Sequence, residues 1–454
     1  MSTTLIRNAA FIGTFDDAQT RYQDGSIFIR GNVIEKIGTA ADVPQTADTI
    51  IDASKLILIP GLINTHHHFY QTLTRNVPGP QDAGLFEWLK TLYPLWARMN
   101  PEAIRISTQI AMAELMLTGC TTAFDHGYVW PHGARVDDQI EGAKAMGMRF
   151  HASRGSMSLG QSKGGLPPDS VVEDEAAILK DSQRVIESYH DPQRYAMLRI
   201  VLAPCSPFSV SGDLMRESIK LARAHQVHSH THLAETFDEE AFCVAQFGKR
   251  PADYASSLGW TGTDVWHAHA VHLSEQDVAM FGATRTGTAH CPSSNMRLGS
   301  GISPVPALRK AGARVGLGVD GSASNDSSAM LEEARQALLI QRVGGNPSAV
   351  TARDVLWIGT RGGAQVLGRD DIGMLAPGMA ADIVGYRTDA LGLAGGAVHD
   401  PLASLIFCRP GNVDFNMIDG RVRISGGNFV DVNLPKLIER HNQIARAMVR
   451  DELH

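Results

Sequence analysis

Hydrophobic and polar positions divide the chain into a β-rich start, a long middle of alternating strands and helices, and a β-rich end. Short apolar runs separated by turn residues open the chain: Leu5–Ile12, Gly25–Arg30 and Val33–Ile37. Gly31-Asn32 joins the last two runs, which is typical of a β-meander. Similar runs return after about residue 366: Ala381–Tyr386, Asn412–Ile418 and Arg421–Ile424.

From Leu56 the pattern changes to short apolar runs that alternate with longer amphipathic stretches. Eight runs are predicted to be strands: Leu56–Thr65, Thr121–Asp125, Arg149–Ser153, Leu198–Ala203, Val227–Leu233, Val265–Ala270, Thr286–His290 and Val315–Asp320. The clearest helices between them are Glu102–Thr118, Glu173–Tyr189, Gly212–His225 and Ser303–Ala311. Eight β/α alternations of this length predict an α/β fold with a closed parallel (β/α)8, or TIM, barrel.

The two ends are predicted to form one small β-domain, with the barrel inserted between its halves. The expected division is 1–58 for the first part of the β-domain, 59–366 for the barrel and 367–430 for the second part. Residues 431–454 follow as a C-terminal unit that contains a polar helix, Leu434–Arg450.

Composition narrows the class of protein. The 454 residues are 43% hydrophobic and 20% charged, which is ordinary for a soluble enzyme. A net charge of -7 argues against nucleic acid as a partner, and no apolar stretch approaches the roughly 20 residues that span a bilayer. The five cysteines are scattered and never form a CxxC pair, and no secretory signal opens the chain, so we expect a cytoplasmic protein with free thiols.

Metal-type and titratable side chains gather at the ends of the predicted strands, where parallel barrels carry their active sites. Side chains alternate along a strand, so His66 and His68 share a face and His67 points away. Other such groups follow later strands: His228, His230, His232, Glu235, His267, His269, His272, His290 and Asp320. Nitrogen and oxygen ligands suit zinc or ferrous iron, which lowers the pKa of a bound water to roughly 7 while a nearby carboxylate moves protons.

Five motifs cover the barrel in order: PGLINTHHH (60–68), HTHLAE (230–235), WHAHAVHL (266–273), HCPSSNMRLGSG (290–301) and LGVDGSASN (317–325). On these motifs the chain resembles the amidohydrolase superfamily, in the branch of guanine deaminases, chlorohydrolases and adenosylhomocysteine deaminases. The resemblance implies a distorted TIM barrel with a β-sandwich domain formed from both chain ends.

The resemblance also implies roles for individual residues. His66, His68, His232 and Asp320 match the metal ligands, Glu235 the proton shuttle, and His269 the histidine beside the hydrolytic water; Asp320 would also accept the water's proton. Some relatives bridge two metals with a lysine, but residues 198–207 contain none, so one divalent ion is expected, zinc ahead of iron.

Differences from the relatives indicate the substrate. Trp96 stands where nucleoside deaminases carry a ribose-binding glutamate, and Cys205 where they carry a histidine, so a free base is favoured over a nucleoside. Gln71 resembles the glutamine that contacts a purine edge, Arg154 could meet a ring carbonyl, and Trp88 or Trp96 could form an apolar wall. Together these residues most resemble the 8-oxoguanine deaminase group.

The predicted function is metal-dependent deamination of a guanine-type base, 8-oxoguanine to urate and ammonia, with guanine or isocytosine as further substrates. Hydrolysis of s-triazines is the alternative, and a non-catalytic binding barrel is an alternative of another class. The expected partners are a small heteroaromatic base and further copies of the chain, without nucleic acid or membrane.

Several side chains have a structural reading as well. His228 and His230 could be core residues or supports of the site, and His272 is expected to be structural. The position of His290 stays open. Three substrate-binding candidates also have open structural roles. Trp88 and Trp96 could belong to a helix core, and Arg154 could simply form an ion pair. Cys205 and Cys291 are expected to be buried thiols, and Glu239-Glu240 a solvated helix face.

Overall fold

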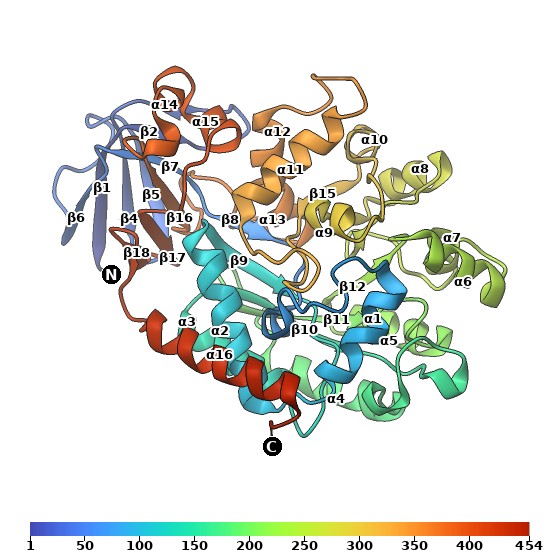
Figure 1. Cartoon of the computed structure of the whole chain (residues 1–454). Helices are drawn as coiled ribbons and strands as arrows, with labels where there is room; N and C mark the ends of the chain where they lie inside the picture. The colour runs from blue at the N-terminus through green and yellow to red at the C-terminus, as the bar shows by residue number, and fades with distance from the viewer. Residues whose placement is uncertain (454) are drawn as a thin grey trace.

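The computed structural model describes residues 1–453, so His454 of the predicted C-terminal unit lies outside the described residues. Eight strands close into a parallel barrel in the order β10-β11-β12-β13-β14-β15-β8-β9, and helices surround it (Figure 1). The barrel strands are β8 Leu62–Asn64, β9 Cys120–Asp125, β10 Arg149–Ser156, β11 Leu198–Pro204, β12 His228–Leu233, β13 Val265–His269, β14 Gly287–His290 and β15 Arg314–Leu317. This confirms the predicted TIM barrel.

The helices begin and end close to the predicted positions. The α-helices are α1 Leu85–Trp96, α2 Pro101–Leu117, α3 Val136–Met146, α4 Glu175–Tyr189, α5 Gly212–Ala224, α6 Phe237–Phe247, α7 Pro251–Ser257, α8 Glu275–Thr284, α9 Pro292–Arg297, α10 Val305–Ala311, α11 Met330–Arg342, α12 Ala352–Trp357, α13 Gly363–Val366, α14 Gly396–His399, α15 Pro401–Phe407 and α16 Leu434–Arg450. Shorter turns are η1 Phe69–Thr74, η2 Gln161–Lys163, η3 Asp169–Val171, η4 Ile358–Gly362 and η5 Leu391–Leu393. Helix α2 begins where the sequence signals it, because the Asn100 side chain accepts a hydrogen bond from the Ala103 backbone N–H and Pro101 takes the first turn.

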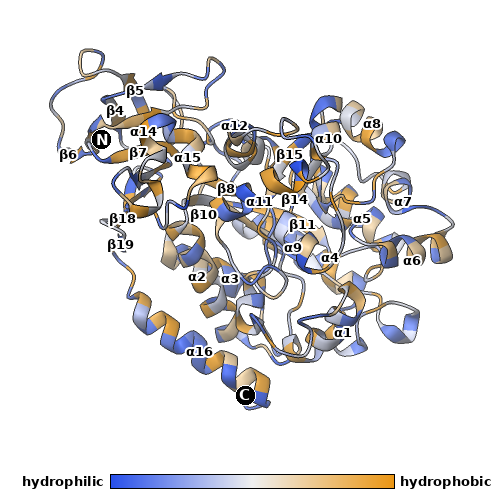
Figure 2. Ribbon diagram, turned by 45° about the horizontal axis from the view of Figure 1, so that its top comes forward, coloured by the Kyte–Doolittle hydropathy of each residue, from blue (hydrophilic) through white to orange (hydrophobic). Residues whose placement is uncertain are grey.

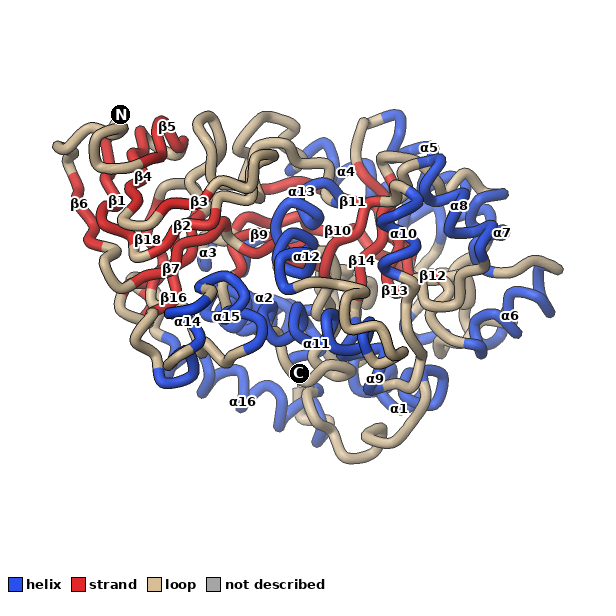
Figure 3. The backbone as a smooth tube through the Cα atoms, turned by 90° about the horizontal axis from the view of Figure 1, so that it is seen from above, coloured by secondary structure: helices blue, strands red, loops and turns tan. Residues whose placement is uncertain are grey.

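The two chain ends form two sheets that lie together at one end of the molecule, beside the barrel (Figure 3). The sheet orders are β5-β4-β1-β6 and β19-β18-β17-β16-β7-β2-β3. Their strands are β1 Thr3–Ala9, β2 Phe11–Gly13, β3 Arg21–Tyr22, β4 Gly25–Arg30, β5 Val33–Gly38, β6 Thr49–Asp52, β7 Leu56–Pro60, β16 Ile383–Arg387, β17 Phe415–Ile418, β18 Arg421–Ser425 and β19 Asn428–Phe429. Ile27 and Ile29 of one sheet share a buried apolar cluster with Leu58 and Ile383 of the other, so the expected sandwich is present.

Two predicted strands each divide into two. The run Leu56–Thr65 separates at Gly61: β7 pairs with β16 and β2 in the seven-stranded sheet, and β8 enters the barrel. A Cβ atom at Gly61 would lie 2.0 Å from the Thr121 hydroxyl oxygen, so the chain passes the barrel wall only without a side chain there. The run Leu5–Ile12 similarly divides into β1 and β2, which belong to different sheets. The four-part division of the chain stays a prediction. Strand β7, which belongs to the seven-stranded sheet, ends at Pro60, two residues beyond the predicted boundary at 58.

A buried ion pair joins the barrel to the end sheets. The Arg149 guanidinium at the start of β10 contacts both carboxylate oxygens of Asp382, at 3.0 and 3.1 Å, and both side chains are buried. Arg149 also donates to the backbone carbonyls of Tyr195 and Ala196. Arg149 also lies 3.3 Å from Asp419 Oδ1, so removing Arg149 would leave the buried Asp382 carboxylate without its cation, which is strongly destabilising.

Helix α16 runs across α2 and η1, with hydrophobic and hydrophilic residues alternating along its length (Figure 2). Its Ile444 and Met448 side chains are buried, and His441 Nε2 lies 3.0 Å from the Thr72 hydroxyl oxygen in η1. Arg98 donates to the carbonyls of Met448 and Val449 at the end of the helix. Within residues 1–453, no helix combines the length and apolar character that crossing a membrane requires.

Candidate metal centre and substrate pocket

Five of the predicted side chains meet at the carboxyl end of the barrel. His66 and His68 follow β8, His232 lies in β12, His269 ends β13, and Asp320 follows β15. All five are at most 7% exposed. His67 is turned the other way, as strand alternation predicts, and its Nε2 lies 2.9 Å from the Ser328 hydroxyl oxygen.

The nitrogen and oxygen atoms of this group are unusually close. Asp320 Oδ1 lies 3.2 Å from His66 Nε2 and 3.3 Å from His68 Nε2. The Nε2 atoms of His68 and His232 are 3.1 Å apart. His66, His232 and His269 offer ring nitrogens that all lie within 4.8 Å of one another.

Backbone carbonyls determine which ring nitrogens carry hydrogen. His68 Nδ1 donates to the His126 carbonyl at 2.7 Å, and His232 Nδ1 donates to the Cys205 carbonyl at 2.6 Å. A carbonyl can only accept, so the Nε2 atom of each neutral ring carries a lone pair.

His66 is oriented through a second histidine. His230 Nδ1 donates to the Trp266 carbonyl at 3.0 Å, which leaves His230 Nε2 to accept from His66 Nδ1 at 2.9 Å. His66 Nε2 therefore also presents a lone pair, and it has no hydrogen-bond partner among the described residues. Three lone pairs and one carboxylate oxygen thus face a common point, which suits a divalent cation.

The electrostatics of the centre favour a positive charge. Burial lowers the pKa of His68, but Asp320 outweighs burial and the net shift raises it. Burial raises the pKa of Asp320, but His66 and His68 outweigh burial and hold it well below its usual range. Burial lowers the pKa of His66 to about 3. The lowered pKa keeps Asp320 ionised at neutral pH, and a bound divalent cation would balance its negative charge.

Glu235 has the opposite character. Burial, followed by the charge of Asp320, raises the pKa of Glu235 well above its usual value. Its Oε2 lies 3.5 Å from His269 Nε2, and that ring is held by Asn295 Oδ1, 2.9 Å from His269 Nδ1. Two carboxyl groups whose pKa values are driven apart are typical of an acid and a base in one active site.

Sequence reasoning missed His126, which lies among the metal-type histidines. Its ring stacks on His232 with centroids 4.7 Å apart, and its Nε2 donates to the Ala203 carbonyl. Its Nδ1 has no partner among the described residues, and a ring nitrogen of His126 lies within 4.8 Å of ligand atoms of His68 and His232. His126 directly follows β9, so the strand-end rule that selected the other histidines applies to it too.

The pocket above this centre is small and mostly apolar. A cavity of about 30 Å³ is lined by the predicted residues Gln71, Trp88 and Cys205 and, among others, by Tyr93, Tyr128, Phe208, Leu298 and Ser324. Helix α1 contributes Leu85, Trp88, Leu89 and Tyr93. Ligand pockets usually measure roughly 300 Å³ or more, so α1 lies close over the site as a roof in this structure.

Two predicted substrate contacts, Trp96 and Arg154, do not line the cavity in this structure. Trp96 is fully buried but donates from its indole N–H to the Thr74 hydroxyl, outside the cavity lining. Arg154 forms ion pairs with Glu173 and Asp181 instead of facing the cavity. Strand β10 extends to Ser156, three residues beyond the predicted end, and so Arg154 lies within the strand on its helix-facing side.

The remaining histidines and Glu239 have defined surroundings. His272 Nε2 lies 2.9 Å from the Ser300 carbonyl oxygen, and His228 lines a different cavity with His151 and Arg199. Both ring nitrogens of buried His290 lack a partner among residues 1–453, and burial lowers its pKa to about 3. The expectation of a solvated Glu239 is wrong: its carboxylate is buried and accepts from the backbone N–H groups of Ala234 and Glu235.

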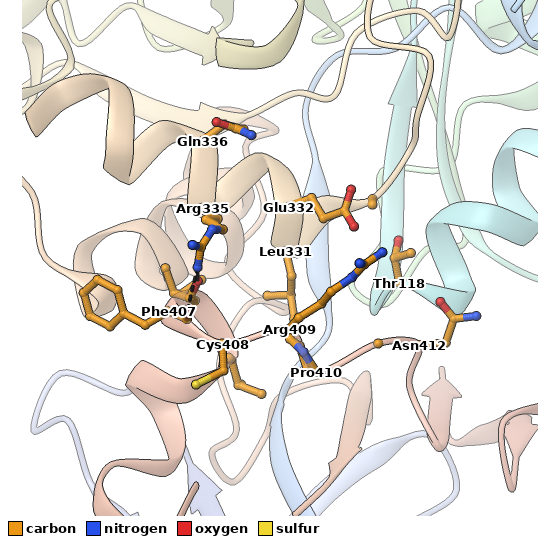
Figure 4. Close-up of a pocket in the computed structure, with 14 residues that line it drawn as sticks. Thr118, Leu331, Glu332, Arg335, Gln336, Phe407, Cys408, Arg409, Pro410 and Asn412 are labelled. Atoms are coloured by element: carbon orange, nitrogen blue, oxygen red, sulfur yellow. Dashed lines mark hydrogen bonds between the residues drawn. The ribbon is translucent and has the colours of Figure 1, made fainter. Parts of the chain in front are cut away.

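A larger cavity of about 480 Å³ lies between α11 and the segment after α15 (Figure 4). Arg335 donates there to the carbonyls of Ile406 and Phe407, and Glu332 and Arg409 also line the wall. The predicted catalytic and metal-binding residues do not line it, so size alone does not identify the catalytic pocket.

Comparisons with known proteins agree with this geometry. The model of the Amidohydrolase family matches residues 57–423. The chain is 46% identical to an 8-oxoguanine deaminase of Pseudomonas aeruginosa, over 99% of this chain and 100% of the relative. It is 38% identical to a hydroxydechloroatrazine ethylaminohydrolase of Pseudomonas sp. strain ADP, over 99% and 96%. The crystal structure of an atrazine chlorohydrolase from Arthrobacter aurescens TC1 in complex with zinc is 31% identical and covers 97% of this chain and 100% of its own, with a TM-score of 0.93.

Proposed function

The chain belongs to the amidohydrolase family, and on that premise we propose that it is a metal-dependent deaminase of a free guanine-type base. The preferred substrate is 8-oxoguanine, converted to urate and ammonia, with guanine and isocytosine as further candidates. One observation carries the proposal: the Glu235 carboxyl, whose pKa burial raises, lines a pocket that also holds the unpaired amide of Gln71. The identity of 46% to an 8-oxoguanine deaminase supports the choice of base.

A divalent metal fits the donor set, and zinc is the preferred ion. His66, His68, His232 and Asp320 would hold it. The Nε2 lone pairs of the three histidines and a carboxylate oxygen of Asp320 face one point, because each Nδ1–H is hydrogen-bonded elsewhere. When bound, such an ion supplies Lewis acidity that makes hydroxide available near neutral pH. The zinc in the related chlorohydrolase structure supports this assignment.

The protein's own groups then handle the protons. Burial raises the pKa of Glu235, which suits its carboxyl to donate a proton to the ring nitrogen of the substrate amidine. Asp320 remains ionised and accepts a proton from the attacking water. His269 Nε2 lies 3.5 Å from Glu235 and 3.9 Å from Asp320, so it can pass a proton between the two carboxyl groups. Water adds to the amidine carbon, and Asp320 then returns the water's proton to the exocyclic amine. The C–N bond breaks, ammonia leaves, and the proton of the added hydroxyl passes to Glu235 as the new C=O bond forms.

The apolar roof favours a planar, uncharged ring. Leu85, Leu89 and Phe208 line the cavity, and its lining within residues 1–453 includes no lysine or arginine. A neutral heteroaromatic base can be enclosed there without leaving a buried charge unpaired. The same apolar walls suit an alkylamino-s-triazine, which keeps triazine hydrolysis as the second candidate, supported by the ethylaminohydrolase relative.

The test is product detection with the metal-loaded enzyme. Ammonia release is measured from 8-oxoguanine, guanine and isocytosine, and chloride or alkylamine release from s-triazines. Turnover of the first group supports the proposal, whereas turnover of triazines alone selects the second candidate. No turnover of either group, together with no stoichiometric divalent metal after purification, would favour a non-catalytic barrel.

We also propose a homo-oligomer acting in the cytoplasm. The five cysteines are all free, which suits a reducing compartment. Leu339 of α11, Val343 directly after that helix, and Phe407 of α15 are exposed apolar side chains that a second copy could cover. Light scattering of the purified protein tests the oligomer: a monomer mass would contradict it.

A further inference from the structure

Buried polar atoms without partners gather beside the metal-type centre. The amide oxygen and nitrogen of Gln71 and the hydroxyl groups of Tyr70 and Tyr93 are buried and have no hydrogen-bond partner among the described residues. We call Gln71, Tyr70 and Tyr93 the polar rim. Buried polar groups are nearly always paired in folded proteins, so several unpaired groups in one place indicate a missing ligand or ordered water.

Two members of the polar rim line the cavity from different elements. Gln71 lies in η1 against Gly321, where a Cβ atom would come within 1.9 Å of the amide oxygen. Tyr93 lies in the roof helix α1. Tyr70 supports them from outside the cavity lining, with its ring edge on Trp96 and Tyr128 at centroid distances of 5.3 and 5.8 Å. The aromatic packing thus holds the rim while its polar atoms stay unpaired.

The Tyr93 hydroxyl has the properties of a hydrogen-bond donor to a neutral ligand. Burial, followed by the nearby Cys205 and Tyr70, raises the pKa of Tyr93 well above its usual value, so the group keeps its proton. The ring is fixed edge-on against Trp96 at 5.7 Å, which limits where the hydroxyl can point. An oxo group on the substrate is the acceptor that such a donor would satisfy.

We propose that Tyr93 is a specificity-determining residue whose hydroxyl donates a hydrogen bond to an oxo group of the bound base. The inference rests on the proposed function, because it assumes an amino-oxo heteroaromatic substrate. Gln71 and Tyr93 would then hold the base from two elements, one fixed to the barrel and one in the roof. A base that lacks the oxo group would leave the tyrosine hydroxyl buried and unpaired, and would be rejected for that reason.

The experiment compares Tyr93→Phe with Tyr254→Phe. Tyr254 is a matched control, because its hydroxyl is also buried and unpaired while its ring stacks on Phe247, with centroids 4.0 Å apart, outside the cavity lining. Steady-state kinetics on 8-oxoguanine and isocytosine are measured for the parent and both variants, with thermal midpoints and metal content as controls. Y93F is expected to raise KM by roughly 10- to 100-fold with a smaller change in kcat, because it removes one hydrogen bond to a buried acceptor.

The two substrates map the contact. A loss on both places the oxo group on the six-membered ring that they share, and a loss on 8-oxoguanine alone places it on the five-membered ring. Equal KM values for Y93F and Y254F on both substrates would overturn the inference while leaving the deaminase function intact. If the parent enzyme released no ammonia from either base, the proposed function itself would fail, which is a separate result.

Discussion

The orientation of His66 depends on one neighbouring side chain, and replacing it should weaken metal binding from a distance. His230 accepts from His66 Nδ1 and donates to the Trp266 carbonyl. The change His230→Phe keeps a ring near Phe124 and Trp266, whose centroids both lie 4.7 Å from that of His230, but removes both nitrogens. His66 can then carry its hydrogen on either nitrogen, so its lone pair is no longer held toward Asp320.

The magnitude follows from the group left unpaired. In H230F the buried His66 Nδ1 loses its partner, whereas the Trp266 carbonyl remains in the hydrogen-bond ladder between β12 and β13. One unpaired buried group costs about 1–3 kcal/mol, so the free energy of unfolding should fall by that amount. Loss of a group that orients a metal ligand typically lowers metal affinity by about 10- to 100-fold. H230Q should recover part of both, because an amide can donate to the carbonyl and accept from His66.

The assay separates stability from metal affinity. Urea unfolding of the metal-free proteins measures the first, and zinc competition against a fluorescent chelator measures the second. His267→Phe is the control: His267 is equally buried in the neighbouring strand and lies 3.0 Å from the Trp260 carbonyl oxygen, but it makes no contact with the centre. Equal zinc affinities for H230F and H267F would refute the orienting role of His230.

Three further changes test other parts of the structure. Glu235→Gln should keep the metal and lower kcat by about 100- to 10,000-fold, since the neutral amide cannot donate a proton to the ring nitrogen; full turnover would show that Glu235 is not the proton donor. Burial raises the pKa of Glu333 from its usual 4.5 to about 8, so its contribution to stability is fully present below about pH 4.5 and is lost as pH rises toward 8. At about 1.36 kcal/mol per pKa unit, the parent should lose roughly 3 kcal/mol more stability than E333Q between about pH 5.5 and pH 8 in urea unfolding, and parallel pH curves would contradict this. Arg154→Gln should lower the thermal midpoint through its lost ion pairs with Glu173 and Asp181 and leave KM unchanged, whereas a large rise in KM would restore the substrate contact.

The barrel was predictable because its strands are short apolar runs of regular spacing, and each run ends in a residue of recognisable chemistry. Strand β9 and its neighbours differ from the predicted bounds by few residues. His126 directly follows β9, so the search of strand ends that found the other histidines could also have found His126. The division of Leu56–Thr65 was not predictable from hydrophobicity, because both halves are fully buried and only the contact of Gly61 with Thr121 separates them.

The substrate pocket was harder to predict because it depends on how a helix packs. In α1, Trp88 and Tyr93 face the cavity and Trp96 faces Thr74, although all three are aromatic and buried. Their difference comes from the rotation of α1 against η1, which no local pattern specifies. Arg154 illustrates a boundary effect: a strand three residues longer than predicted changes which side of the barrel wall its side chain occupies.

The packing of α16 on η1 has a consequence for the order in which the protein is made. All four proposed metal-binding residues have been synthesised once the ribosome has passed Asp320, but His441, which contacts Thr72 beside Gln71, follows more than a hundred residues later. At about 5–20 residues per second, this leaves an interval of roughly 6–25 s. During that interval a nascent chain carries every proposed metal-binding residue but lacks the helix that supports η1, so metal capture can precede substrate recognition within a single round of translation.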